Sequence, residues 1–116
     1  MFTLKNNPIL NDYQIEILRI FFATHLGKKF FLTGGTALAA FYLGHRLSKD
    51  LDLFTVEKYD SLELEKIIEQ IAVRTNSKIK EKVKSETYNE IYFEHKKKKW
   101  IQRVDFVKEQ PVVFGK

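Results

Sequence analysis

The chain of 116 residues contains no cysteine. Disulfide bridges and thiolate metal sites are therefore excluded, and a reducing cytoplasm is the compartment that we expect. No apolar run approaches the ~20 residues that a membrane-spanning helix needs. The N-terminal sequence MFTLKNNPIL also lacks the long apolar segment of a secretion signal. These absences predict a cytoplasmic protein that does not enter a membrane.

The residues that are present describe an ordinary soluble domain. Hydrophobic residues make up 44% and charged residues 30% of the chain, and the length predicts a single domain over residues 1–116. The net charge of +5 and the pI near 9.4 favour anionic partners such as nucleotides or nucleic acid. A basic surface that serves only solubility accounts for this charge equally well, because net charge does not define a site.

Hydrophobic periodicity and turn residues predict the order α-β-α-β-α-β-β-β, which is an α/β or α+β domain with a mixed sheet flanked by helices. The expected helices cover residues 11–25, with Asn11 as the N-cap and Gly27 after the end, residues 36–43, and residues 61–76, with Asp60 as the N-cap. The expected strands cover residues 28–33 (buried), 49–56, 78–84, a hairpin over 89–107 with Lys96–Lys99 at its turn, and a last short strand near 111–115.

Two aspartates of the strand KDLDLFTV point to one face, while the intervening leucines point to the core. Asp50 and Asp52 are then about 6–7 Å apart and repel each other by roughly 2–3 kcal/mol at an effective dielectric near 20. A fold tolerates this repulsion where the face is wet, where a cation lies between the acids, or where basic side chains neutralise them. Mg²⁺ or Mn²⁺ suits such oxygen ligands. The alternative is a solvent-exposed face, or pairing with Arg46 and Lys49.

The segment LTGGT lies between an apolar strand and a helix. Gly34 and Gly35 let the backbone approach a ligand closely. Their N–H groups and the start of the following helix form an anion site, to which Thr36 adds a hydroxyl. The alternative is a tight strand-to-helix turn in which the glycines supply only backbone freedom. The segment is not a Walker A loop, because no Gly-Lys-Ser/Thr follows.

Together the glycine turn and the aspartate pair favour a single active site. A turn that holds phosphates, beside carboxylates that hold metal ions, is what two-metal phosphoryl or nucleotidyl transfer needs. A third acid usually completes such a site, and Asp105 in RVDFV is the candidate.

Residues 34–54, GGTALAAFYLGHRLSKDLDLF, resemble the pattern of the polymerase β-like nucleotidyltransferases: a glycine pair, a helix, and two acids one residue apart on a strand. Thirteen residues separate Thr36 from Asp50, which is at the long end of that pattern. The finer form, with Arg46 and Ser48 before the acids, looks most like the AbiEii/AbiGii toxin family. Members of that family are nucleotidyltransferases of toxin–antitoxin and abortive-infection systems.

The resemblance implies a function and a site. The expected function is transfer of NMP from an NTP to a hydroxyl of an RNA, for example a tRNA, or of a protein, with two Mg²⁺ or Mn²⁺ ions and with an antitoxin as a further partner. The implied metal ligands and catalytic residues are Asp50, Asp52 and Asp105. The implied nucleotide-binding residues are Gly34, Gly35, Thr36, Arg46 and Ser48.

Other readings stay open at this point. Family members usually continue into a mostly helical C-terminal part, so this chain is either a fragment or a minimal domain. A non-catalytic module of the same fold would bind a nucleotide or a partner without turnover. A metal-dependent nuclease would use the acids but would leave the glycine turn unexplained. The lysines of KIKEKVK, which we expect on one strand face, suit either a polyanion surface or the protection of an edge strand.

Overall fold

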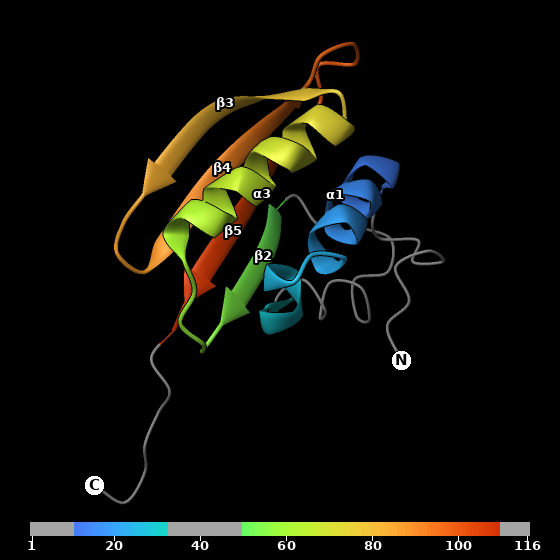
Figure 1. Cartoon of the computed structure of the whole chain (residues 1–116). Helices are drawn as coiled ribbons and strands as arrows, with labels where there is room; N and C mark the ends of the chain where they lie inside the picture. The colour runs from blue at the N-terminus through green and yellow to red at the C-terminus, as the bar shows by residue number, and fades with distance from the viewer. Residues whose placement is uncertain (1–10, 33–49, 110–116) are drawn as a thin grey trace, which may run out of the picture.

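The computed structural model describes residues 11–32 and 50–109, which form two α-helices, one 3₁₀ helix and a five-stranded sheet (Figure 1). The helices are α1 (Asp12–Phe22), η2 (Leu26–Lys29) and α3 (Ser61–Arg74). The strands are β1 (Phe31–Leu32), β2 (Asp50–Thr55), β3 (Ser77–Lys84), β4 (Tyr88–His95) and β5 (Ile101–Lys108).

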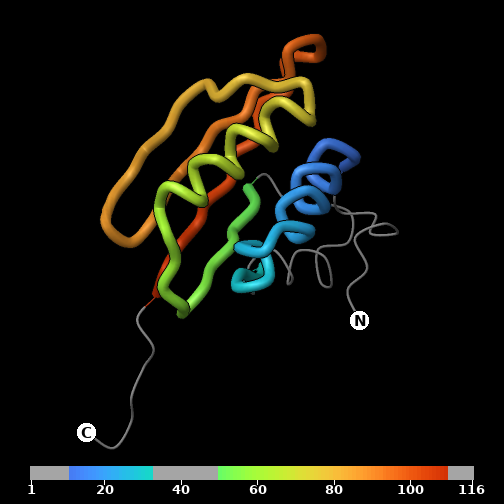
Figure 2. Tube along the Cα trace, viewed as in Figure 1, coloured from blue at the N-terminus to red at the C-terminus, as the bar shows by residue number. Residues whose placement is uncertain are grey.

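The sheet is mixed, which confirms the expected α+β class. Its spatial order is β1-β2-β5-β4-β3, with β2 parallel to β5 and the other neighbours antiparallel. Strand β5, the last strand in the described part of the chain, therefore lies between β2 and the β3–β4 hairpin. Figure 2 shows β2 and β5 side by side, although the whole of α3, β3 and β4 separates them along the chain.

Helix α1 begins where the sequence predicts. The side chain of Asn11 accepts a hydrogen bond from the backbone N–H of Gln14, and the side chain of Gln14 accepts one from the N–H of Asn11, so the capping box is complete. The helix ends at Phe22, earlier than predicted, and Gly27 lies in η2. A Cβ atom on Gly27 would lie 1.9 Å from the carbonyl oxygen of Phe21. Only glycine therefore lets η2 fold back this closely against the end of α1.

The expected buried strand over residues 28–33 is wrong in extent and in burial. Residues 26–29 form η2, and among the described residues of this segment only Phe31 and Leu32 pair with β2. The buried aromatic residue is Phe30, whereas the side chain of Phe31 is 48% exposed. The expected helix over residues 36–43 and the expected strand near 111–115 lie outside the described residues.

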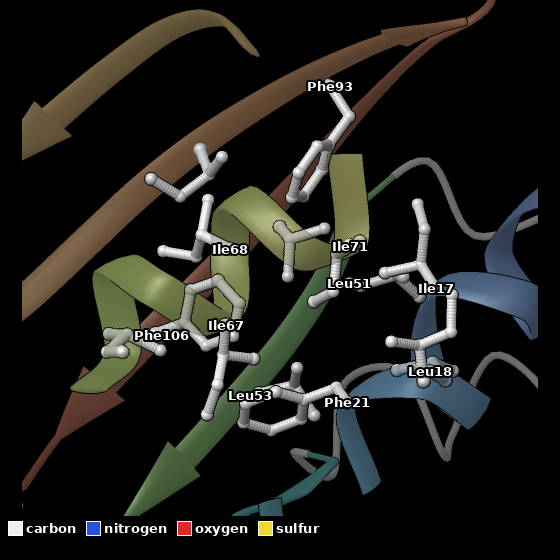
Figure 3. Close-up of a cluster of buried hydrophobic side chains, with 14 of the residues drawn as sticks. Ile17, Leu18, Phe21, Leu51, Leu53, Ile67, Ile68, Ile71, Phe93 and Phe106 are labelled. Atoms are coloured by element: carbon white, nitrogen blue, oxygen red, sulfur yellow. The ribbon is translucent and has the colours of Figure 1, made fainter. Parts of the chain in front are cut away.

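The core lies between one face of the sheet and the two α-helices (Figure 3). Asp60 caps α3 by accepting a hydrogen bond from the N–H of Leu62. The predicted stripe of α3, Leu64, Ile67, Ile68 and Ile71, is buried as expected. It packs in one cluster with residues of α1 and with the inward-facing residues of β2, β4 and β5. None of the described helices is both long and apolar enough to cross a membrane.

The lysines of β3 do not share one face, contrary to the expectation. The strand is at the edge of the sheet, as one reading required. A register shift between Ile79 and Glu81, however, reverses the direction of the side chains that follow it. Lys78 forms an ion pair with Glu94 of β4, whereas Lys84 forms one with Glu65 of α3 on the helix side.

Candidate active site

The face of the sheet opposite α1 and α3 carries a row of acids across three strands. Asp52 of β2 and Asp105 of β5 are direct partners in the parallel pair, and Glu90 of β4 is the antiparallel partner of Asp105. Asp50 is two residues before Asp52 and points to the same face. We call these four residues the acid cluster.

Burial of the opposite face fixes the direction of these side chains. In β2 the leucines beside the aspartates, Leu51 and Leu53, are fully buried. Val104 and Phe106, on either side of Asp105, are also fully buried. A slip of one residue would place carboxylates in the apolar core, so the strand register is strongly specified.

Arg103 lies among the acids, as the cross-strand partner of Asp50. Its Nε donates to Oδ1 of Asp105 at 2.9 Å and its Nη2 donates to Oδ2 at 3.0 Å, so the pair is bidentate. The same Nη2 lies 3.3 Å from Oε1 of Glu90. The hydroxyl of Tyr92 donates to Oε2 of Glu90 at 2.7 Å. The guanidinium group is thus held by acids of β5 and β4 and stays 35% exposed.

The charges on this face shift the pKa of two groups in a consistent way. Burial raises the pKa of Asp52, and the charges of Asp105 and Asp50 raise it further, while Arg103 lowers it only in part. The hydrogen bonds to Asp105 raise the pKa of Arg103 above its usual range. Burial and two neighbouring carboxylates therefore disfavour the charged form of Asp52, and Arg103 offsets this only in part.

The acid cluster suits a divalent cation in donor type but not in its present arrangement. Carboxylate oxygens are the ligands that Mg²⁺ and Mn²⁺ prefer, and the raised pKa of Asp52 indicates a place where a cation would be favourable. In residues 11–32 and 50–109, however, no three acidic or histidine side chains are grouped closely enough to hold a metal ion. Both oxygens of Asp105 accept hydrogen bonds from Arg103 instead.

The structure brings together the three acids that the sequence singled out, Asp50, Asp52 and Asp105. The predicted nucleotide-binding residues, Gly34, Gly35, Thr36, Arg46 and Ser48, lie outside the described residues. The last described residue before the glycines is Leu32, and its cross-strand partner is Leu53, which directly follows Asp52. The described part of β1 therefore pairs with the strand that carries Asp50 and Asp52.

Sequence reasoning missed Arg103 and Glu90. A signal for Arg103 was present, because its spacing of two from Asp105 places both on one strand face. Glu90 offered no comparable signal, since its place beside Asp105 depends on the register of the β4–β5 hairpin.

The comparisons with known proteins give a family for this arrangement. The model of the family described as "Nucleotidyl transferase AbiEii toxin, Type IV TA system" matches residues 16–111. The matched region contains the acid cluster, Arg103 and the glycine segment. No curated protein and no solved structure gives a significant match.

Proposed function

From the premise that the chain belongs to the AbiEii nucleotidyltransferase toxin family of type IV toxin–antitoxin systems, we propose that it transfers NMP from an NTP to a hydroxyl of an RNA, such as a tRNA, or of a protein. The observation that carries the proposal is the direct pairing of Asp52 with Asp105 on parallel strands, with Asp50 beside them. Acids from two strands on one face give a transferase a compact negative site.

The described residues support a division of roles. Asp50, Asp52 and Asp105 would hold Mg²⁺ or Mn²⁺, with two ions in the complete site, and such ions neutralise the phosphates and activate the attacking oxygen. Asp105 would orient the attacking hydroxyl. A carboxylate has about four lone-pair positions, and Arg103 uses two of those on Asp105. Asp105 therefore keeps the capacity to accept a further hydrogen bond.

The nucleotide end of the site rests on the family resemblance. Gly34, Gly35 and Thr36 would bind the triphosphate through backbone N–H groups and a hydroxyl. Arg46 and Ser48 would contact a phosphate or support the acids. We further propose that the chain is one nucleotidyltransferase domain over residues 1–116, that it works in the cytoplasm, and that a cognate antitoxin controls it, in keeping with the type IV family.

The test is a transfer assay with the full-length protein. The protein is incubated with each labelled NTP and Mg²⁺, in the presence of total RNA or of total protein. We expect label to enter one of these two pools. Asp50→Asn/Asp52→Asn should reduce the transfer by at least about a thousandfold, which is the scale of losing electrostatic stabilisation of a transition state.

Glu69→Gln is the matched control, because it removes an exposed carboxylate from α3 on the other side of the sheet. It should leave the transfer unchanged. Transfer that persists in the double aspartate variant would contradict the assignment of the acids. NTP binding by calorimetry without any transfer would favour the alternative, a non-catalytic binding module of this fold.

A further inference from the structure

Arg103 is the cation that the described part of the chain places among the acids of the site. Its bidentate bond with Asp105 ties up the one acid that β5 contributes. Each oxygen of Asp105 keeps a second lone pair, but a second cation there would lie next to the guanidinium charge. Two cations so close repel each other strongly at a partly buried position. Arg103 and a divalent cation therefore cannot both use Asp105 fully.

We propose that Arg103 is a latch that competes with the divalent cation for Asp105. Without the cation, both carboxylate oxygens of Asp105 accept hydrogen bonds from Arg103. When the cation binds to the acids, Arg103 releases Asp105. The proposal rests on the proposed function, because it concerns the regulation of the same site.

The structure also supplies partners for the guanidinium group of Arg103 after it leaves Asp105. Nη2 of Arg103 is already 3.3 Å from Oε1 of Glu90. The hydroxyl of Tyr92 holds the other oxygen of Glu90, and the guanidinium carbon lies 5.9 Å from the centre of the Tyr92 ring. Arg103 is partly exposed and so has room to turn. When Arg103 leaves Asp105 it can stay paired with Glu90, so neither state leaves the guanidinium group unpaired.

Two simpler roles for Arg103 predict different behaviour. If Arg103 only holds Asp105 in the correct orientation for the metal ion, its removal weakens metal binding. If Arg103 acts only as a nearby positive charge, its removal strengthens metal binding by the same factor whether or not Asp105 is present. The latch alone predicts a gain that needs Asp105.

The test measures binding of Mn²⁺ alone to the full-length protein, from the electron paramagnetic resonance signal of free Mn²⁺. Arg103→Gln should bind Mn²⁺ on the order of tenfold more tightly than wild type, the usual scale of coupling between competing ligands. Without Asp105 the gain should disappear, so Arg103→Gln/Asp105→Asn should bind Mn²⁺ no more tightly than Asp105→Asn. Arg103→Lys should show a smaller gain, because lysine keeps the charge but not the bidentate fork.

Two further variants serve as controls. Arg19→Gln removes an exposed arginine of α1 that pairs with Glu16, and it should leave Mn²⁺ affinity unchanged. Glu90→Gln removes the acid that pairs with Arg103 after its release from Asp105. It should therefore weaken Mn²⁺ binding several-fold when it is made in the wild-type protein, but not when it is made in Arg103→Gln. Circular dichroism checks that each variant is folded, and Arg103→Lys carries the test if Arg103→Gln is not.

The outcomes separate the latch from the proposed function. Weaker or unchanged Mn²⁺ binding by Arg103→Gln, or an equal gain with and without Asp105, would overturn the latch. The proposed function would still stand in that case if wild type binds Mn²⁺ and Asp50→Asn/Asp52→Asn does not. If neither wild type nor Arg103→Gln binds Mn²⁺, the latch and the proposed metal site both fail.

Discussion

The two faces of β2 and β5 differ in what they tolerate. Toward α1 and α3 these strands present buried side chains that are mostly apolar. The apolar ones all belong to a single core cluster. Toward the other side they present Asp50, Asp52, Asp105 and Arg103, so like charges lie on neighbouring strands. The covered face holds the fold together, whereas the acidic face carries charge repulsion that does nothing for stability and that a transferase can use.

Strand periodicity connects the two faces, because each residue that fixes one face also fixes the other. The acids can remain close together since the leucines, the valine and the phenylalanine between them anchor the strands. The comparison therefore predicts that substitutions on the covered face change stability, whereas substitutions on the acidic face change function and change stability little or even favourably.

The largest effect is expected from Phe106→Ala. The Phe106 ring is fully buried and packs edge-to-face on Phe21, with ring centres 5.2 Å apart. Its truncation should lower the free energy of unfolding by about 3–5 kcal/mol, as measured by urea denaturation. The neighbouring Val107 points to the other face, and Val107→Ala should cost less than about 1.5 kcal/mol. Equal costs at the two positions would contradict the comparison.

A smaller effect is expected from Ser77→Ala, which tests how the covered side accommodates polar groups. The Ser77 hydroxyl is buried, 2.6 Å from the Tyr13 hydroxyl and 2.9 Å from the Thr75 hydroxyl. Its loss should cost about 1–3 kcal/mol, because the hydroxyl of Tyr13 loses a buried partner.

The double variant Tyr13→Phe/Ser77→Ala separates a lost bond from an unsatisfied group. It removes both hydroxyls, so it should cost less than the sum of the two single variants in the same urea titration. Strict additivity would mean that the two hydroxyls do not act as a pair.

The prediction from the sequence was better for the acidic face than for residues 28–33, which precede it in the chain. Alternation of leucine and aspartate in DLDLFT defines both the strand and the direction of its carboxylates, and the structure confirms both. The run KKFFLT has no such alternation. Its apolar residues suggested one buried strand, but Gly27 allows a 3₁₀ turn first, and Phe30 rather than Phe31 enters the core.

The sequence predicted the hairpin of β4 and β5, which the structure confirms, but not the other contacts between strands. The insertion of β5 between β2 and β4 decides that Asp105 meets Asp52 on one side and Glu90 on the other. Periodicity fixes the face of each side chain but not which strands are neighbours. For the same reason, the register shift in β3 that separates its lysines could not be foreseen from the regular spacing of those lysines.

The smallest effect is expected from Asp52→Asn, and its sign differs from that of the other stability predictions. The pKa of Asp52 is raised in the folded protein by burial and by Asp105 and Asp50. An acid with a raised pKa favours folding while it is protonated, and this contribution is lost as the pH rises through the folded pKa. At pH 7 the ionised Asp52 therefore destabilises the protein. Asp52→Asn should raise the free energy of unfolding by a few tenths to about 1 kcal/mol, the scale of a like-charge pair on adjacent strands.

The pH dependence of this gain is the sharper measurement. Urea denaturation of wild type and Asp52→Asn with EDTA present should show the gain at neutral pH. The gain should shrink as the pH falls through the folded pKa and vanish below about 3.9, the usual value for aspartate, where both states of the wild type are protonated. Because the variant also loses the proposed cation ligand, adding Mn²⁺ in place of EDTA should stabilise wild type more than Asp52→Asn. A variant less stable than wild type at pH 7 in EDTA would mean that Asp52 already has a sufficient counter-charge within the protein, and the acidic face would then be as well balanced as the covered one.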